Sequence, residues 1–377
     1  MSDYTIWPAT ANRWAVCAGS IQAEARYPDI RTDASDEGDI AHELAKLWIP
    51  LIARGASGEI PDDPRFTPEI IDGVSEYVAA VQDAMREIGC FTPQVEEFIA
   101  IPRIHQCNGG RLDCSLWSPG SGVLWIFDFK FGHRVVEHIG DFQLVEYAIG
   151  KLDQLSAGNG MMDEVVTVKM TIAQPRAYHP EGPVRTWTVR GSDLRSYANT
   201  LRFQAEQSQD PNPPTVAGPH CLNCRAARDC RTLQMAAAGV VDRIERLELN
   251  NLSPDHRGYE LSYLDRATDI LKARKDALEA EALAQAQMGT PTPGWGIGTG
   301  RGSKIWTASV DEVAAMGDLL EIDLRKPMEV ITPTQAINVK KVDADVINAY
   351  SKTTPGKARL IRSNETISAR LFSANTK

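Results

Sequence analysis

The stretch from Gly109 to Tyr147 constrains the fold of this chain more than any other. The segment Ile99–Trp117 has alternating apolar residues and ends at the turn-forming cluster Ser118–Gly122. The run Val123–Lys130 that follows is mostly apolar, as in a strand buried on both faces. The next segment, Asp141–Leu155, has a helical pattern. The stretch therefore predicts a hairpin followed by a helix.

Polar side chains interrupt the apolar pattern where the second strand ends. Asp128 and Lys130 are two residues apart, so on a strand they project from the same face. Burying them unpaired would be costly, and Asp113 on the preceding strand is the natural third member. Two carboxylates on adjacent strands form a hard oxygen site suited to Mg²⁺ or Mn²⁺, beside which a lysine can orient a water or offset phosphate charge. A purely structural Asp–Lys pair is the alternative.

Two segments before the hairpin carry further candidate ligands. His42 lies near the start of an amphipathic helix predicted over 33–55, where it is either a metal ligand or an ordinary packed histidine. Glu96 and Glu97 fall where the sheet begins. We expect a solvated strand start there, from which one of the two could still approach the metal.

The helix after the hairpin contributes an amide and a phenol. Gln143 and Tyr147 lie one turn apart on the same helical face. Together they could hydrogen-bond a nucleotide or hold the lysine of the site.

The remaining patterns predict a mixed α/β fold. Helices are expected within 5–30 and over 67–89 and 192–207, and strands over 164–178 and 184–189. No Gly-rich fingerprint follows the first strand, which excludes a dinucleotide-binding unit.

The cysteines indicate metal or redox chemistry rather than a disulfide framework, because their number, seven, is odd. Cys221, Cys224 and Cys230 form a C-x2-C-x5-C cluster after a Pro-rich linker, and Cys17 is the outstanding candidate for a fourth ligand. Four thiolates with one distant in sequence fit a [4Fe–4S] cluster. The alternative is a structural Zn²⁺ with Cys17 or His220 as the fourth ligand.

Length and composition limit the classes of protein to consider. The 377 residues, 43% of them hydrophobic, can bury a full core and suggest about two domains. No apolar run of about 18 residues occurs, and the N-terminus lacks a signal-peptide pattern, so we expect a cytoplasmic protein with no membrane partner. The net charge of −10 argues against a general nucleic-acid coat protein, but not against an enzyme with acidic metal ligands.

The chain changes character after the cysteine cluster. Residues 236–288 have helical patterns that predict an arm, either for homo-oligomerisation or packed on the first domain. The glycine-rich segment near 289–304 has the wrong order for a phosphate-binding loop, which excludes an NTPase. From Asn338 onward, eight basic and three acidic residues give a net charge of +5. We interpret this as a tail that faces nucleic acid or as the end of an ordinary small domain.

Several motifs resemble, in content and order, the RecB-like branch of the PD-(D/E)XK nuclease superfamily. They are His42, G-R-L-D ending at Asp113, D-F-K at Asp128–Lys130 and Q-x-x-x-Y at Gln143–Tyr147. With its four cysteines the chain resembles the iron–sulfur subgroup that includes AddB-type and CRISPR-adaptation nucleases. RWAVCAGS followed by EGDIAHELA resembles a phage and prophage family of that type. The resemblance covers about residues 10–235, and it departs from many relatives in having Ala18, where they have proline, after Cys17.

The resemblance implies a restriction-endonuclease-like mixed sheet flanked by helices, with an iron–sulfur-stapled helical part and a C-terminal α+β extension. The corresponding domains are a nuclease domain over 1–235, a helical arm over 236–288 and a small module over 289–377. The implied metal ligands are His42, Asp113, Asp128 and the backbone carbonyl of Phe129. The resemblance further implies that Lys130 positions or activates the attacking water, and that Gln143 and Tyr147 orient Lys130 and the DNA strand.

Two functional classes follow. The first is a metal-dependent deoxyribonuclease, an exonuclease that processes single-stranded or duplex DNA ends in phage replication or recombination, with little sequence specificity. A phage single-strand-binding or annealing protein is its expected partner in the bacterial host. The second class is a catalytically silent DNA-binding or scaffold protein that keeps the fold. The intact Asp–Asp–Lys set favours the first.

Overall fold

The structure is a computed structural model that describes residues 5–28, 31, 33–55, 63–156, 160–244, 254–290, 292, 293 and 295. The elements below all belong to Met1–Ile297, the first of two compact units into which the chain divides. Most of the module predicted over 289–377, including its basic tail, lies outside the described residues. Among the described helices, none combines the length and the apolar character that a membrane crossing requires.

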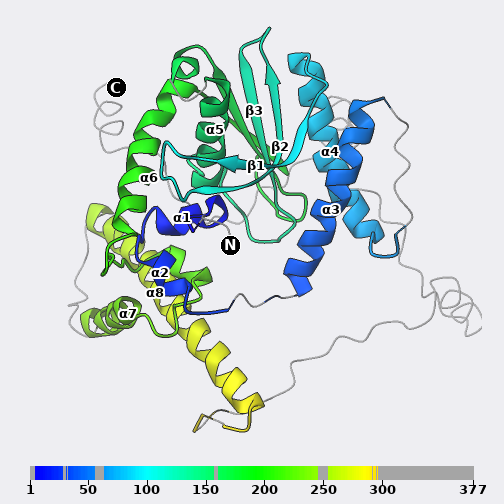
Figure 1. The fold of residues 1–377 in the computed structure, drawn as a ribbon. Helices are drawn as coiled ribbons and strands as arrows, with labels where there is room; N and C mark the ends of the chain where they lie inside the picture. Colours follow the sequence, from blue (N-terminus) through cyan, green and yellow to red (C-terminus); the bar gives the residue numbers. More distant parts are fainter. Residues whose placement is uncertain are drawn as a thin grey trace, which may run out of the picture. The chain divides into compact units, whose positions relative to one another are not determined.

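A five-stranded mixed sheet, flanked by helices, forms the centre of the fold (Figure 1). Its strands follow chain order: β1 (Gln94–Ala100), β2 (Gly109–Ser118), β3 (Val123–Phe129), β4 (Thr167–Ala173) and β5 (Val184–Arg190). Neighbouring strands are antiparallel, except that β3 and β4 are parallel. A parallel pair needs a crossover, and α5 (Phe142–Leu155) supplies it. The hairpin-then-helix prediction is thus confirmed.

Helices cover both faces of the sheet (Figure 1). On one face lie α3 (Asp33–Ala53) and α4 (Pro68–Ile88), and on the other lie α5 and α6 (Arg195–Gln207). Strand β3 shows the reason, because its alternate apolar side chains enter two different cores. Leu124 and Ile126 pack toward α5, whereas Trp125, Phe127 and Phe129 pack toward α3 and α4.

Local sequence sets the ends of the helices beside the site. The hydroxyl of Thr67 accepts a hydrogen bond from the backbone of Ile70 at the start of α4, and Gly89 ends α4 in a left-handed conformation. Asp141 caps α5 by accepting from the backbone N–H of Leu144 at 2.9 Å. This cap fixes the helical turn that carries Gln143.

Two predicted segments are divided in the structure. A turn over 101–108 separates β1 from β2 within Ile99–Trp117, because Pro102 cannot donate to a ladder and the N–H of Asn108 bonds within the turn to His105. The helix expected within 5–30 is three short pieces. They are η1 (Pro8–Thr10), α1 (Ala11–Trp14) and α2 (Ser20–Glu24).

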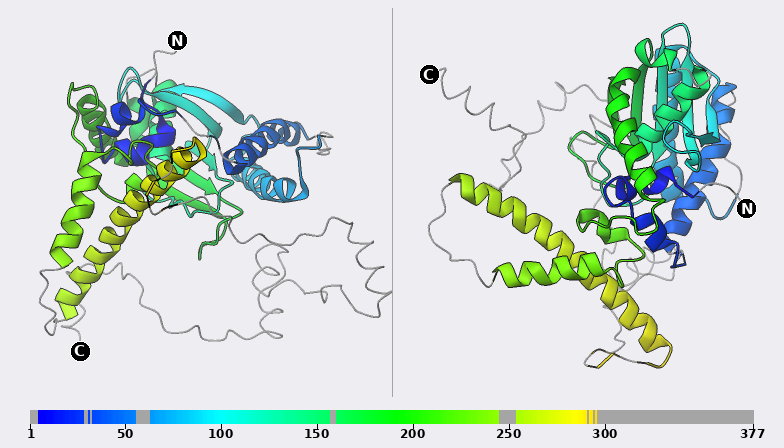
Figure 2. Two further views of the ribbon diagram at one scale, coloured as in Figure 1. Left: turned by 90° about the horizontal axis from the view of Figure 1, so that it is seen from below. Right: turned by 60° about the vertical axis from the view of Figure 1, so that its left-hand side comes forward.

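The helices that follow the sheet form a third apolar core. It contains η4 (Pro219–Asn223), α7 (Arg231–Ile244) and α8 (Pro254–Gln287), with Cys221, Leu233 and Ile270 among its buried residues. Figure 2 shows α7 and α8 crossing each other. Because η4 also contacts α1, the N-terminal segment lies against the cysteine-bearing part of the chain.

Candidate active site

The residues predicted from the D-F-K motif lie together at the end of β3. Lys130 Nζ donates to Asp128 Oδ1 at 3.1 Å and lies 2.9 Å from Oδ2. Gln143 of α5 binds both residues. Its Oε1 accepts from Lys130 at 2.9 Å, and its Nε2 donates to Asp128 Oδ1 at 2.8 Å. The spacing of two residues therefore places the carboxylate and the amine side by side, as expected for a strand.

Asp113 on β2 and His42 on α3 complete the predicted group. Asp113 Oδ2 accepts from the backbone N–H of Phe129 at 2.7 Å, which fixes this carboxylate beside the end of β3. Its Oδ1 lies 3.5 Å from His42 Nδ1. The imidazole packs edge-on against the Phe129 ring, with ring centroids 5.3 Å apart. Elements from both faces of the sheet thus supply polar groups to one place.

Glu96 also belongs to the site, where the sequence favoured a solvated strand start. Its Oε1 lies 3.8 Å from His42 Nδ1, and ligand atoms of Glu96, His42 and Asp113 lie within 4.8 Å of one another. The pairs Val95–Cys114 and Glu97–Leu112 of β1 and β2 lie on either side of Glu96 and Asp113, which brings the two carboxylates near each other. Its backbone φ is 54°, a conformation that is unfavourable for a residue with a Cβ and is concentrated at functional sites. Strand patterns do not encode such a backbone twist, so the sequence named Glu96 and Glu97 as possible ligands but could not choose Glu96 over a solvated strand start.

Tyr147 contacts the backbone of β2 rather than the lysine. Its hydroxyl donates to the carbonyl of Arg111 at 2.6 Å. Gly110 permits this approach, since a Cβ at that position would lie 2.9 Å from the hydroxyl and 2.8 Å from Pro8 Cδ. Tyr147 therefore positions β2 against α5, while Gln143 provides the contact with Lys130.

Burial and neighbouring charges set the protonation of the site. Burial raises the pKa of Asp113 and Asp128. Burial opposes the charge on Lys130, but Asp128 and Asp113 outweigh it and raise the pKa of the lysine. Burial likewise opposes the charge on His42, whose pKa is nevertheless raised to about 9 by Asp113, Glu96 and Asp128. Buried carboxylates that resist ionisation gain stability when a cation joins them.

The donor set fits a hard divalent cation. Asp128 Oδ2 is buried, and its polar contact is the ion pair with Lys130 Nζ at 2.9 Å, beside which a cation could bind. Carboxylate oxygens with one imidazole suit Mn²⁺ and Mg²⁺. The group lines a cavity of about 490 Å³, a volume typical of ligand sites.

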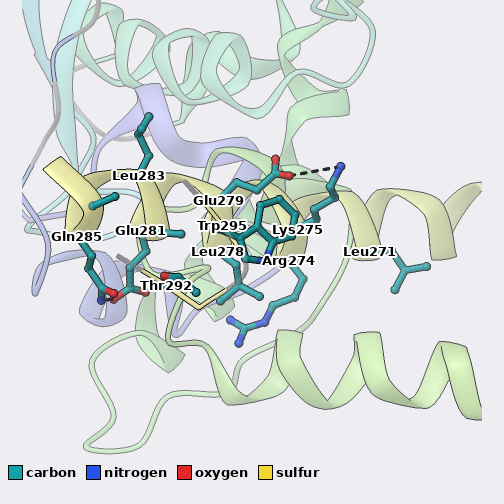
Figure 3. A pocket seen from close by; sticks show the side chains of 12 residues that line it. Leu271, Arg274, Lys275, Leu278, Glu279, Glu281, Leu283, Gln285, Thr292 and Trp295 are labelled. Carbon is teal, nitrogen blue, oxygen red and sulfur yellow. Dashed lines mark hydrogen bonds and ion pairs between the residues drawn. The ribbon is translucent and has the colours of Figure 1, made fainter. Parts of the chain in front are cut away.

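A larger cavity of about 760 Å³ lies along α8 (Figure 3). Its walls include the apolar side chains of Leu271, Leu278 and Trp295. Lys275 and Glu279 form an ion pair with each other at 3.5 Å, so their charges offset each other. No acids and histidines converge there among the described residues. We therefore place the candidate active site at β2 and β3, since charge and geometry decide chemistry and volume does not.

Cys17 lies close to Cys221, since both contact the backbone of Val216. The backbone N–H of Val216 donates to Cys17 Sγ at 3.4 Å, and the thiol of Cys221 lies 4.0 Å from the carbonyl of the same residue. Among the described residues no three cysteine sulfurs lie within 4.8 Å of one another.

The chemistry of the thiols also bears on a metal. Burial raises the pKa of Cys17 and Cys221, and it raises the pKa of Cys224 to about 12. These thiols therefore stay protonated at neutral pH unless a metal displaces the proton. His220, the alternative zinc ligand, already uses Nε2 to contact the carbonyl of Val216 at 2.8 Å.

Comparison with known proteins identifies a family. The family described as "Protein of unknown function (DUF2800)" matches residues 5–366. The chain belongs to this family. Among solved structures, this DUF2800 chain is similar to the crystal structure of a "Putative exonuclease" from Eubacterium rectale. The two share 15% sequence identity with a TM-score of 0.32, and the match covers 55% of this chain and 80% of that chain.

Proposed function

We propose that this DUF2800 protein is a metal-dependent deoxyribonuclease of the RecB-like PD-(D/E)XK type that acts as an exonuclease. One observation carries the proposal: Asp113, Asp128 and Lys130 converge with His42 in a single cavity. The order of the motifs in the sequence supports the same conclusion. The alternative is a catalytically silent scaffold, which has less reason to bury these charges because burial is costly.

The residues that would hold Mg²⁺ or Mn²⁺ are His42, Asp113, Asp128 and the backbone carbonyl of Phe129, with Glu96 beside them. When bound, such an ion supplies a water of lowered pKa and offsets negative charge on the phosphodiester.

The side chains of the chain then have separate tasks. Lys130, kept charged by Asp128, offers an ammonium group to the charge that develops on the phosphate and to the attacking water. Gln143 holds the ammonium and the carboxylate through two hydrogen bonds, so neither has to reorganise during the reaction. Tyr147 keeps β2, and with it Asp113, in place beside α5.

The cysteines are proposed to hold a [4Fe–4S] cluster, with zinc as the alternative. The C-x2-C-x5-C pattern and the position of Cys17 beside Val216, close to Cys221, support a metal site here. Such a cluster would join the segment between α1 and α2 to the segment that contains η4.

The proposed setting is the processing of DNA ends in phage replication or recombination, in the bacterial cytoplasm. A phage single-strand-binding or annealing protein is the proposed partner. Affinity purification from infected cells tests this setting, which is wrong if no replication or recombination protein is recovered.

Hydrolysis of end-labelled DNA tests the enzyme itself. Single-stranded and duplex substrates are incubated with Mg²⁺ or Mn²⁺ and either wild type or Asp128→Asn. We expect the variant to lose at least about 100-fold in rate, because its neutral amide is a poorer ligand. Arg202→Ala, on the surface of α6, is the control. Equal rates for wild type and Asp128→Asn would contradict the assignment, and DNA binding without hydrolysis would favour the scaffold.

A further inference from the structure

One arginine in the wall of the candidate cavity has no carboxylate partner among the residues that the structure describes. The Lys and Arg side chains that line this cavity are Arg111, Lys130 and Arg134. Arg111 lies 3.9 Å from the Glu96 carboxylate and donates to its backbone carbonyl, and Lys130 pairs with Asp128. Arg134 is exposed, and its guanidinium makes no ion pair or hydrogen bond with any residue that the structure describes. Its charge is therefore available to a ligand.

The segment that carries Arg134 is held by one buried amide. Gln174, directly after β4, is 1% exposed. Its Nε2 donates to the carbonyls of Gly132 at 3.0 Å and Arg134 at 2.6 Å. Its Oε1 accepts from the backbone N–H of Val136 at 3.1 Å. A single side chain thus fixes the backbone on both sides of the arginine.

Arg185 of β5 completes this support. Its Nη2 donates to Gln174 Oε1 at 3.1 Å and to the carbonyl of Val136 at 2.8 Å. Arg185 is 2% exposed, and within the described part of the chain it forms no ion pair with a carboxylate. Burying a guanidinium on carbonyl and amide partners is costly, so its presence here indicates that the position of the segment matters.

We propose that Arg134 binds a phosphate of the DNA backbone beside the one that is cleaved, and that Gln174 is the positioning residue that holds Arg134 at the cavity. The inference rests on the proposed function, because it assigns the substrate contact of the same cavity. A guanidinium presents two parallel N–H groups to phosphate oxygens, which makes arginine suited to this contact. Lys130, held beside Asp128, is proposed to act on the phosphate that is cleaved, so the two cations have different tasks.

A DNA-binding measurement with a protein that cannot hydrolyse DNA tests the Arg134 contact separately from catalysis. The Asp128→Asn protein is titrated with a labelled single-stranded oligonucleotide between about 50 and 200 mM salt, with and without Arg134→Ala. We expect Arg134→Ala to weaken binding about 10-fold and to reduce the salt slope by about one, with Arg134→Lys intermediate. Arg202→Ala, which removes an equally exposed arginine on α6, should leave the slope unchanged.

Kinetics test the role of Gln174. In the otherwise wild-type protein, Gln174→Glu keeps the acceptor for Val136 but loses both donated hydrogen bonds. We expect Arg134→Ala and Gln174→Glu each to raise KM about 10-fold with kcat within about 2-fold of wild type, and the double variant to be no worse than either. A melting temperature within a few degrees of wild type shows that Gln174→Glu is folded.

The outcomes distinguish the inference from the proposed function. An unchanged salt slope and KM for Arg134→Ala would overturn the phosphate contact, even in a protein that hydrolyses DNA. Additive losses in the double variant would overturn the positioning role of Gln174. Wild type that binds DNA without hydrolysing it would remove the proposed function, while the salt slope would still decide on Arg134.

Discussion

At the scale of single residues, Glu96 joins a functional group to an unfavourable backbone. A left-handed conformation costs a residue with a Cβ about 1–3 kcal/mol, and glycine removes most of this cost. Glu96→Gly should therefore raise the melting temperature while it lowers the rate of DNA hydrolysis at least about 10-fold.

Glu96→Ala is the matched control for this prediction. It removes the same carboxylate but keeps the unfavourable conformation, so it should be as slow as Glu96→Gly and less stable. Thermal melting and a hydrolysis assay check both variants. Full activity in either would show that the Glu96 carboxylate has no part in the site.

Glu146 gives a prediction about pH. Its side chain is fully buried on α5, and burial raises its pKa well above 4.5 although the Asn108 side chain beside it lowers that pKa. Because the pKa of Glu146 is higher in the folded than in the unfolded protein, its contribution to stability is complete below the pKa of the unfolded state. This contribution is lost as the pH rises through the pKa of the folded state. Glu146→Gln should therefore gain stability relative to wild type between pH 5 and pH 8, by at most about 1.4 kcal/mol per pH unit.

Urea unfolding of wild type and Glu146→Gln at pH 5 and pH 8 measures this difference. Glu206→Gln, an exposed substitution on α6, is the control. A difference between Glu146→Gln and wild type that is the same at both pH values would refute the prediction.

The sequence predicted the residues of the site whose signal is local. Asp128 and Lys130 follow from strand periodicity, and Gln143 follows from its place one turn from Tyr147. In this way Glu96 could be named only as one of two possible ligands, and Arg134 could not be found. The first depends on a single backbone torsion, and the second depends on hydrogen bonds from Gln174 that join segments about 40 residues apart.

At the scale of elements, the contact between α5 and β1 allows no additional atoms. A Cβ at Gly150 would lie 2.4 Å from Ile99 Cγ2 and 3.0 Å from Ile101 Cγ1. Gly150→Ala should therefore push α5 away from the sheet and cost about 1–3 kcal/mol of stability. Because α5 carries Gln143, hydrolysis should slow as well.

Gly239→Ala in α7 is the matched control, because a Cβ there meets no atom within 4 Å. It should be neutral or stabilising by about 0.5–1 kcal/mol, as expected for alanine in a helix. Urea unfolding compares the two. Equal free energies of unfolding for the two variants would mean that the sheet accommodates a Cβ at residue 150 without loss of stability.

Element boundaries show where periodicity was sufficient. The helix ends at Thr67, Gly89 and Asp141 were predictable because capping is local. The turn within 101–108 was missed, since its apolar residues continue the alternation of the strands on either side while its hydrogen bonds are local to the turn.

At the scale of the whole molecule, the mixed α/β class was predictable. The mostly apolar sequence of β3 requires a core on each face of the sheet, and the helical segments before and after it can cover those faces. The order of the sheet and the meeting of Cys17 with the later cysteines depend on contacts distant in sequence. A sequence pattern can predict such a distant contact only when the residues share a ligand, as a metal would be shared by Cys17 and the later cysteines. The three-domain division stays a prediction.

The cysteine cluster gives a prediction at this scale. Protein purified without oxygen should absorb near about 400 nm and contain iron, and Cys17→Ser and Cys224→Ser should lose the colour and unfold at lower temperature. Cys107→Ser, outside the cluster, should keep both properties. Colourless protein with stoichiometric zinc would replace the iron–sulfur assignment by a zinc site.

The N-terminal segment belongs to two centres at once. Trp7 and Pro8 form part of the wall around the carboxylates, while Cys17, a few residues later, lies against Val216 beside η4. If the cysteines hold the proposed iron–sulfur cluster, oxidants that dismantle it would release this N-terminal segment at the end that bears Cys17. The proposed DNA cleavage would then fall under oxidative stress although none of the carboxylates had been touched.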